Sequence, residues 1–582
     1  MARHSSHRHR QERKALRTAK IQYITAEELF GRPKNTAVAP DATTMARSNK
    51  KQQRQRLQGH LLHLSDIAFW ILLGLIGLAL LISSFLYLQI QNNNDIVGWT
   101  LQQQQQQQQP QKKDPPHLYP PLPFLPAFPS IANAEQLIHQ VLYDNQPTIA
   151  GIAAILYQFL EELHRSNIQL TSTSTHADLL REIQTSYFKL VQKHLLPLEK
   201  AYRNRPVFEI RQDESIFVSI AAFREHLLAD TLRSLFENAA HPEKLFVGVI
   251  VNNCFDDGQC QGGVKVVGTD PNTGKDILEP IHGSADTNHI ATFCQETNST
   301  LPQYCKNGQV RVLYIRESEA LGPAMARYYS SKLWGGETYY VQIDSHLQFA
   351  QHWDELYFLT DLKLCQSYPK AILSTYPPGF VNFRPHPPFT PGTRLCKCQL
   401  RAEEGYLPRV EMQGRCKEGE PRPTQMAFLG AGFFFTSAEF LVDVPFDPFL
   451  PWLFMGEEIA LSIRAWTSGW NIYAPRKNLI GHQYRPISMG TPHYQDTLGR
   501  FFHRPGLVSR AQEQIRNRIK YMLGYPKLLE GKNLTKQESL LEAEHYGLGK
   551  ERSREEYLQF AEIDLEEMTC GPMKWCIDGT LE

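Results

Sequence analysis

An aspartate and a histidine stand two residues apart at the end of an apolar run. The stretch from Tyr339 to Phe349 reads YYVQIDSHLQF, so Asp344 and His346 follow its apolar half. Side chains two apart in an extended chain point to the same side. A carboxylate oxygen and an imidazole nitrogen at this spacing suit one Mn²⁺ or Mg²⁺ ion, with diphosphate oxygens and water completing about six ligands. A solvated turn that binds nothing is the alternative.

Two adjacent glutamates and a later histidine also have residue types that suit chemistry. Glu457 and Glu458 follow Gly456 and begin a predicted helix. The helix dipole favours a carboxylate at this position, which explains one of the two. A pair beside an aromatic-rich loop favours contact with a sugar or an acceptor. His482, in NLIGHQYR, ends another short apolar stretch and is a candidate third metal ligand, although a lone histidine is usually structural.

The candidate metal ligands and glutamates must be held by regular secondary structure, and the sequence predicts a sheet that could hold them. Apolar runs predict strands, and amphipathic runs predict helices between them. Strands are expected at 216–223, 245–253, 309–316 and 337–343, and helices at 226–240 and 323–333. This alternation predicts an α/β fold with a parallel sheet, whose ligands bind at the carboxyl ends of the strands. The polar insertion from Cys254 to Gly308 holds four cysteines and is expected to be a loop pinned by disulfides.

The small-residue stretch FLGAGFFF (428–435) comes before the glutamates. Glycine and alanine are favoured where the backbone must approach another group closely. We therefore expect the backbone of this stretch to approach another group closely.

The N-terminal part predicts membrane attachment. The first 64 residues are polar and basic, which is typical of a disordered cytosolic tail. From Ile67 to Ile90 there are 24 residues without a charge, enough to cross a bilayer as a helix. Arg54 and Arg56 precede this run, and no Lys or Arg lies between 91 and 111. The positive-inside rule then predicts type II topology, with the large C-terminal part luminal.

The remaining chain divides by composition. A polyglutamine and proline-rich stretch at 91–130 predicts an extended stem, and 131–205 predicts a helical stem region. The α/β pattern occupies 206–490, and 491–582 predicts a charged helical extension. A formal net charge of +1 argues against a dedicated nucleic-acid binder.

All ten cysteines lie beyond the predicted span, which favours disulfides in an oxidising compartment. Cys570 and Cys576, in CGPMKWC, are expected to pair with each other. Zinc is the rival interpretation for Cys396 and Cys398, which form a C-x-C pair. Sequons at Asn298 and Asn533 are candidate glycosylation sites.

The order and spacing of these features resemble one family. The stretches IFVSIAAFREHLLADTLRSLFENAAHPEKLFVGVIVNNC, VRVLYIRESEALGPAMARYYSSKLWGGETYYVQIDSHLQF and FMGEEIALSIRAWTSGWNIYAP with GHQYR are similar to N-acetylglucosaminyltransferases that modify protein hydroxyproline, relatives of polypeptide N-acetylgalactosaminyltransferases. The tail segment HYGLGKERSREEYLQFAEIDL is also similar. The resemblance implies a GT-A (Rossmann-like) fold, UDP-GlcNAc as donor and a divalent cofactor, Mn²⁺ or Mg²⁺.

The resemblance also assigns roles to residues. It implies a metal site of Asp344, His346 and His482, with Asp344 also contacting the nucleotide sugar, and catalytic acids Glu457 and Glu458. The further residues implied to bind the nucleotide sugar are Ala221, Arg224, Glu225, Arg316, Gly322 and Arg327.

Together these inferences predict a metal-dependent, retaining transferase in the Golgi membrane. It would transfer GlcNAc to a hydroxyl of hydroxyproline, Ser or Thr on a secretory-pathway protein, or to a glycan. The best-described hydroxyproline-modifying members act in the cytosol, and the predicted span departs from that pattern. The alternatives are an inactive sugar-binding relative, a transferase using UDP-GalNAc, and a structural or adhesion protein.

Overall fold

The computed structural model describes the greater part of the chain beyond residue 130. The described residues are 131–166, 182–255, 260–269, 276–283, 285–297, 299–402, 405–484, 508–525 and 539–580. The predicted cytosolic tail, membrane span and proline-rich stem lie outside these ranges, as do Asn298 and Asn533. Within these ranges, every helix is too short or too polar to cross a membrane.

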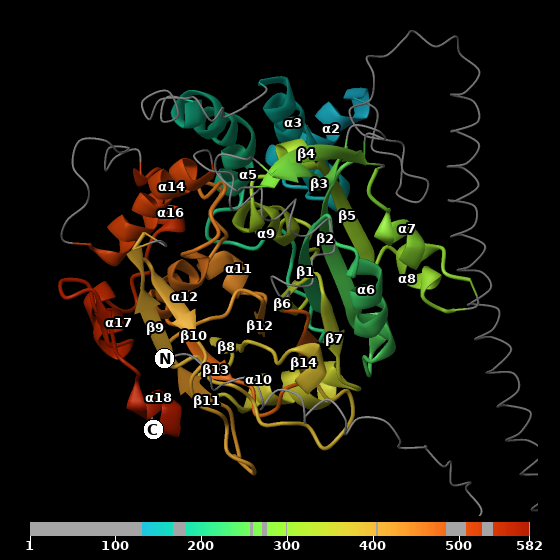
Figure 1. The fold of residues 1–582 in the computed structure, drawn as a ribbon. Helices are drawn as coiled ribbons and strands as arrows, with labels where there is room; N and C mark the ends of the chain where they lie inside the picture. The colour runs from blue at the N-terminus through green and yellow to red at the C-terminus, as the bar shows by residue number, and fades with distance from the viewer. Residues whose placement is uncertain are drawn as a thin grey trace, which may run out of the picture. The chain divides into compact units, whose positions relative to one another are not determined.

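An eight-stranded sheet forms the centre of the fold (Figure 1). In sheet order its strands are β11 (Thr424–Met426), β13 (Asn471–Ala474), β8 (Ala371–Ser374), β12 (Phe433–Ser437), β6 (Tyr339–Asp344), β1 (Ile216–Phe223), β2 (Leu245–Asn253) and β5 (Val310–Arg316). The predicted parallel arrangement is confirmed for β6, β1, β2 and β5, which pair in parallel. β12 runs antiparallel to both of its neighbours.

The strands are apolar because both faces of the sheet are covered. On β1, Phe217 belongs to one hydrophobic core, while Val218 and Ile220 belong to the core on the other face. β6 begins two residues later than predicted, because Glu337 turns inward and accepts hydrogen bonds from Arg211 and Arg311. The strand ends at Asp344, the first residue of the predicted metal pair.

Helices cover each face. The core that contains Val218 is closed by α6 (Leu228–Glu237), α7 (His289–Cys294), α8 (Pro302–Lys306), η5 (Trp353–Leu359) and α10 (Thr360–Leu364). The core that contains Phe217 is closed by α3 (Ile149–Ser166), η1 (Ile183–Phe188), η2 (Val191–Leu195), α5 (Leu196–Ala201), α9 (Pro323–Ser331), α11 (Phe440–Asp443), α12 (Glu457–Thr467), α14 (Val508–Leu523), α16 (Ala543–Tyr546), α17 (Arg554–Phe560) and α18 (Lys574–Asp578). The region 131–205 is thus helical where described, with α2 (Ile131–Leu142) packed on α3, and it shares the core of the sheet.

The insertion after β2 is more ordered than a loop. β3 (Cys260–Thr269) and β4 (Asp276–Gly283) form an antiparallel hairpin, and α7 and α8 follow it. The expected disulfide is present, since Cys294 at the end of α7 pairs with Cys305 in α8. Asn288 caps α7 by accepting a hydrogen bond from the Ala291 amide.

Two-stranded pairings attach distant segments to this framework. β14 (Ile480–His482) pairs with β7 (Leu347–Phe349), and β10 (Pro408–Glu411) pairs with β9 (Lys397–Leu400). A third pair joins β15 (Ile563–Asp564) to β16 (Thr569–Cys570) near the C-terminal end. The first of these pairs brings residues 347 and 482 into register, which places the predicted metal ligands in one region.

The predicted Cys570–Cys576 disulfide is wrong. Cys396 pairs with Cys576, and Cys398 pairs with Cys570. Cys396 and Cys398 lie two residues apart in extended chain and therefore face the same side, where β16 and α18 lie. Because both cysteines are oxidised, they offer no thiolates to zinc, and the zinc interpretation is also wrong.

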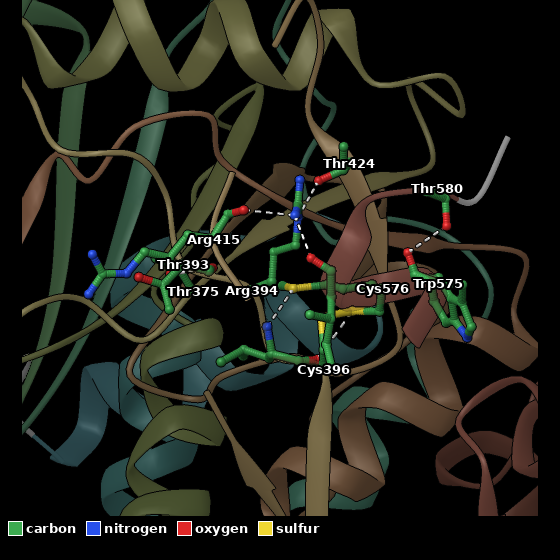
Figure 2. The surroundings of a disulfide bond; sticks show 12 residues. Thr375, Thr393, Arg394, Cys396, Arg415, Thr424, Trp575, Cys576 and Thr580 are labelled. Carbon is green, nitrogen blue, oxygen red and sulfur yellow. Dashed lines mark hydrogen bonds between the residues drawn. A yellow bond between two sulfur atoms is a disulfide. The ribbon is translucent and has the colours of Figure 1, made fainter. Parts of the chain in front are cut away.

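A buried arginine reinforces the Cys396–Cys576 disulfide (Figure 2). The guanidinium of Arg394 donates to the carbonyl oxygens of Arg415 and Ile577 and to the hydroxyl of Thr424. The C-terminal helix α18 is thus joined to the segment before β9 by the disulfide and by the Arg394–Ile577 hydrogen bond, and Arg394 links both to the loop that follows β10.

We expect the two long-range disulfides together, Cys396–Cys576 and Cys398–Cys570, to stabilise the fold more than the Cys294–Cys305 disulfide. The long-range bonds close nearly the same loop, with separations of 180 and 172 residues, so that loop opens only when both are removed, whereas Cys294–Cys305 closes a separation of 11 residues. In the chain-entropy model the loop of 180 residues contributes about 2.5 kcal/mol more to the free energy of unfolding than the loop of 11 residues. Denaturant unfolding of a variant with Cys396, Cys398, Cys570 and Cys576 all replaced by Ala, and of Cys294→Ala/Cys305→Ala, measures the difference. Equal losses in the two variants would contradict the expectation.

Candidate active site

Asp344 lies at the carboxyl end of β6, in the middle of the sheet. Its neighbour on β1 is Ala221, and its amide donates to the carbonyl of Gly432. A Cβ on Gly432 would lie 2.8 Å from Asp344 Oδ2, so only glycine leaves the carboxylate in this position. The predicted close approach of the 428–435 backbone is therefore confirmed at the site itself.

His346 lies beyond the end of β6 and is held by a buried carboxylate. Its Nδ1 lies 2.9 Å from Oε2 of Glu225, which follows β1. The same carboxylate accepts a hydrogen bond from the Leu227 amide at 3.0 Å. Carboxylates commonly orient metal-binding histidines in this manner. Burial lowers the pKa of His346, although the charge of Asp344 opposes this, and the neutral ring is the form that binds metals.

His482 reaches Asp344 from the far end of the chain. β14 places it beside β7, and the Gln483 amide donates to the His346 carbonyl at 3.1 Å. His482 Nε2 lies 3.1 Å from Asp344 Oδ2, and the two imidazole rings are 4.7 Å apart between centroids. Its Nδ1 is buried and has no hydrogen-bond partner among the described residues.

These three side chains fit a divalent ion. Ligand atoms of Asp344, His346 and His482 all lie within 4.8 Å of one another, the only such group in the described part of the chain. One carboxylate and two imidazoles suit Mn²⁺ and related transition metals. Glu225 orients the His346 ring as carboxylates do for metal-binding histidines, and His482 Nε2 lies beside Asp344 Oδ2, where one ion could contact both. Burial by itself would raise the pKa of Asp344, but the His482 hydrogen bond and the charge of Arg327 hold it well below its usual range.

Arg327, on α9, bridges two of the candidate acids. Its Nη2 lies 3.0 Å from Asp344 Oδ1, and its Nη1 donates to Glu457 Oε2. Arg327 and Glu457 are both buried. Removing one member of a buried ion pair leaves an uncompensated charge, which typically costs about 3–5 kcal/mol. Arg327 therefore fixes the positions of β6 and α12 relative to each other.

Glu457 and Glu458 begin α12, as predicted, but their surroundings differ. Burial raises the pKa of Glu457, and Arg327 opposes that rise. Glu458 accepts hydrogen bonds from the Tyr376 hydroxyl and from the Ala431 amide, the latter at 2.9 Å. Burial nevertheless raises the pKa of Glu458 to about 7. Glu457 is thus paired with a cation, Arg327, whereas Glu458 is hydrogen-bonded to the neutral donors Tyr376 and Ala431.

The other predicted nucleotide-sugar residues lie around the same edge of the sheet. Arg224 follows β1, and its guanidinium donates to Asp286 at 2.7 and 2.8 Å and to Glu317 at 3.3 Å. Arg316 ends β5, and Gly322 precedes α9 with a φ of 90°. All the residues predicted to bind the nucleotide sugar therefore lie at or near the carboxyl ends of the parallel strands. Their binding of a nucleotide sugar stays a prediction.

The sequence analysis did not single out two tyrosines that contact the site. Tyr376 follows β8 and donates to Glu458. The Tyr484 ring lies 4.1 Å from the His482 ring, and its hydroxyl donates to the Pro377 carbonyl. Tyr484 belongs to the quoted GHQYR segment, so its proximity to His482 was a usable signal. Tyr376 had only an apolar run before it and prolines after it.

Comparison with known proteins identifies a family. The family model described as glycosyltransferase (GlcNAc) matches residues 215–567, which include every site residue above. No curated protein sequence matches the chain.

Solved structures give weaker similarities. GalNAc-T7 with UDP, GalNAc and Mn²⁺ is 13% identical, with 66% of each chain covered and a TM-score of 0.35. TarS of S. aureus in complex with UDP-GlcNAc is 13% identical over 47% of this chain and 59% of that chain, with a TM-score of 0.25. A mannosyltransferase from Pyrobaculum calidifontis in complex with GDP-Man and Mn²⁺ is 12% identical over 64% and 81%, with a TM-score of 0.26. The chain spans less than two thirds of the first two structures, 66% and 59%.

We expect Gly432→Ala to lower the affinity for Mn²⁺ by about tenfold or more, because the new Cβ would displace the Asp344 carboxylate. Gly379→Ala is the matched control, since the nearest atom to its Cβ would be 3.8 Å away. Titration calorimetry with Mn²⁺ measures both variants. Equal affinity in Gly432→Ala and the wild type would show that Asp344 is not a ligand.

The raised pKa of Glu458 predicts a pH-dependent stability. The folded protein binds this proton more tightly than the unfolded chain, in which the value is 4.5. The contribution of Glu458 to the free energy of unfolding therefore falls by about 2–3 kcal/mol as pH rises from about 4.5 to about 7.5.

Denaturant unfolding of Glu458→Gln across this pH range tests that expectation. The variant should show a flatter profile than the wild type over the same window. Glu418→Gln, at an exposed carboxylate, should keep the wild-type profile. Parallel profiles for the wild type and Glu458→Gln would contradict the assignment.

Proposed function

The chain belongs to the glycosyltransferase (GlcNAc) family, and from that membership we propose that it transfers GlcNAc from UDP-GlcNAc to a hydroxyl acceptor. The observation that carries the proposal is the convergence of Asp344, His346 and His482 at the carboxyl edge of the sheet. Ligands bind at that edge in open α/β sheets. The mixed sheet with a D-x-H pair at the end of β6 is consistent with a GT-A fold.

The proposed reaction exchanges one bond for another at the anomeric carbon. The bond from that carbon to the diphosphate oxygen breaks, and the acceptor hydroxyl oxygen forms the new bond. The hydroxyl proton leaves with UDP, which balances the reaction. With retention of configuration, the acceptor attacks from the side that the diphosphate leaves, so no separate base is required.

The chain's own residues would stabilise and position the reactants. Arg327 is a buried cation beside Asp344, where negative charge on a departing diphosphate would develop. Glu457 holds Arg327 in place, and Glu458 fixes Tyr376 on the opposite side. A divalent ion held by Asp344, His346 and His482 would neutralise charge on the leaving diphosphate.

We also propose a luminal location for the acceptor, on a secretory-pathway protein. The uncharged run from Ile67 to Ile90 follows basic residues, which supports a type II signal anchor. The disulfides that contain Cys305, Cys570 and Cys576 support an oxidising compartment such as the Golgi lumen. The acceptor hydroxyl would belong to hydroxyproline, Ser or Thr.

We expect Asp344→Asn and His482→Ala to reduce UDP release from UDP-GlcNAc, in the presence of Mn²⁺, by about 100-fold or more. Asp344→Asn removes the negative charge of one proposed metal ligand, and His482→Ala removes another ligand. His139→Ala, on exposed α2, should retain wild-type release. A coupled UDP assay measures all three.

Two outcomes would contradict the proposed site and donor, and a third would contradict the metal requirement. One is full UDP release by Asp344→Asn. The other is release from a different UDP-sugar but none from UDP-GlcNAc, which would correct the donor. Undiminished release after removal of divalent ions by EDTA would show that the metal is not needed.

A further inference from the structure

An open groove adjoins the site on the side away from Ala221 and Arg224. Its volume is about 960 Å³. The described residues that line it are Tyr376, Pro377, Pro378, Gly379, Val381, Asn382, Phe383, Arg384, Thr390, Thr393, Met412, Gln413, Gly414, Arg415, Asn478 and Tyr484. We call this cavity the arginine groove, because Arg384 and Arg415 are the only charged side chains among those lining residues.

The inner wall of the arginine groove is formed by residues that contact the site. Tyr376 donates to Glu458, and the Tyr484 ring lies against His482. The Tyr484 hydroxyl is anchored on the Pro377 carbonyl at 2.8 Å, so this wall is fixed. A molecule bound in the groove against Tyr376 and Tyr484 would therefore lie next to the candidate metal site.

The charge of the groove is unbalanced. Arg384 and Arg415 are both exposed, and neither guanidinium has an ion-pair partner in the described part of the chain. The nearby arginine Arg394 differs, since it is buried and paired with Glu420. Arginines without an acidic partner beside a site are typical of surfaces that recognise carboxylates or other anions.

The rim of the groove favours a peptide over a neutral glycan. Val381 is 98% exposed and Met412 is 52% exposed, so aliphatic side chains border the opening. Apolar side chains of a peptide would cover these residues, whereas neutral sugars would leave the two arginines without a counter-charge.

We propose that the arginine groove binds the acceptor as an extended peptide with acidic residues near the modified hydroxyl. This proposal rests on the proposed transferase function and adds its substrate class. Arg384 and Arg415 would bind the flanking carboxylates. The hydroxyl would then lie beside Tyr376 and Tyr484.

A charge reversal in the full chain tests the proposal by direct binding. The probes are fluorescein-labelled peptides with one threonine flanked by glutamates, by glutamines or by lysines. The wild type should bind the glutamate peptide about tenfold more tightly than the glutamine peptide, and less so at high salt. Arg384→Glu/Arg415→Glu should reverse the preference towards the lysine peptide. A misfolded variant would instead bind none of the three peptides, so a reversed preference cannot result from misfolding.

The control carries the same change in charge outside the groove. Lys417→Glu/Arg422→Glu alters two exposed cations that do not line it, and it should keep the wild-type preference. An unreversed preference in the groove variant would overturn the proposal. So would tighter binding of an anionic glycan than of the glutamate peptide.

Donor binding separates this proposal from the proposed function. The groove variant should bind UDP-GlcNAc with unchanged affinity, because the groove lies apart from the predicted donor residues. Loss of UDP-GlcNAc binding with an unaltered peptide preference would place the arginines on the diphosphate and overturn the acceptor proposal. Peptide binding that depends on the arginines, without any sugar transfer, would instead contradict the proposed transferase function and support the proposal that the groove binds acidic peptides.

Discussion

The shared guanidinium of Arg327 is the contact on which the site depends. It lies between Asp344, at the end of a central strand, and Glu457, at the start of a helix from a later part of the chain. All three groups are buried or nearly so, and the Glu458 carboxylate lies beside them. Buried like charges repel strongly, so the packing of α9, β6 and α12 must keep the cation centred. This requirement limits how far the strand and helix can move relative to each other.

The strands and the D-x-H pair could be predicted because their signals are local. Asp344 and His346 stand after an apolar run, and the two-residue spacing alone puts them on one side. The βαβ unit was visible from the same kind of pattern. The position of His482 beside them was implied by family resemblance only, because its pairing with β7 spans more than a hundred residues and leaves no periodic trace.

The contacts that could not be predicted are those between a loop and an element far away in the sequence. Tyr376 reaches Glu458 because the residues after β8 fold back over α12, and nothing in STYPPGF indicates this. The cysteine pairing failed for the same reason. Proximity in sequence favoured Cys570 with Cys576, whereas the fold places them beside Cys398 and Cys396, at the start of β9. Disulfide connectivity depends on tertiary packing, which spacing does not encode.

The two long-range disulfides have a consequence for biosynthesis. Cys396 and Cys398 leave the ribosome 180 and 172 residues before Cys576 and Cys570. At about 5–20 residues per second, they wait about 10–35 seconds for their partners. During that interval the thiols of Cys396 and Cys398, two residues apart, can be oxidised to a disulfide with each other or with Cys365 or Cys416. Correct pairing therefore cannot begin until more than 170 further residues have been synthesised, and a disulfide isomerase would correct wrong pairs formed before then.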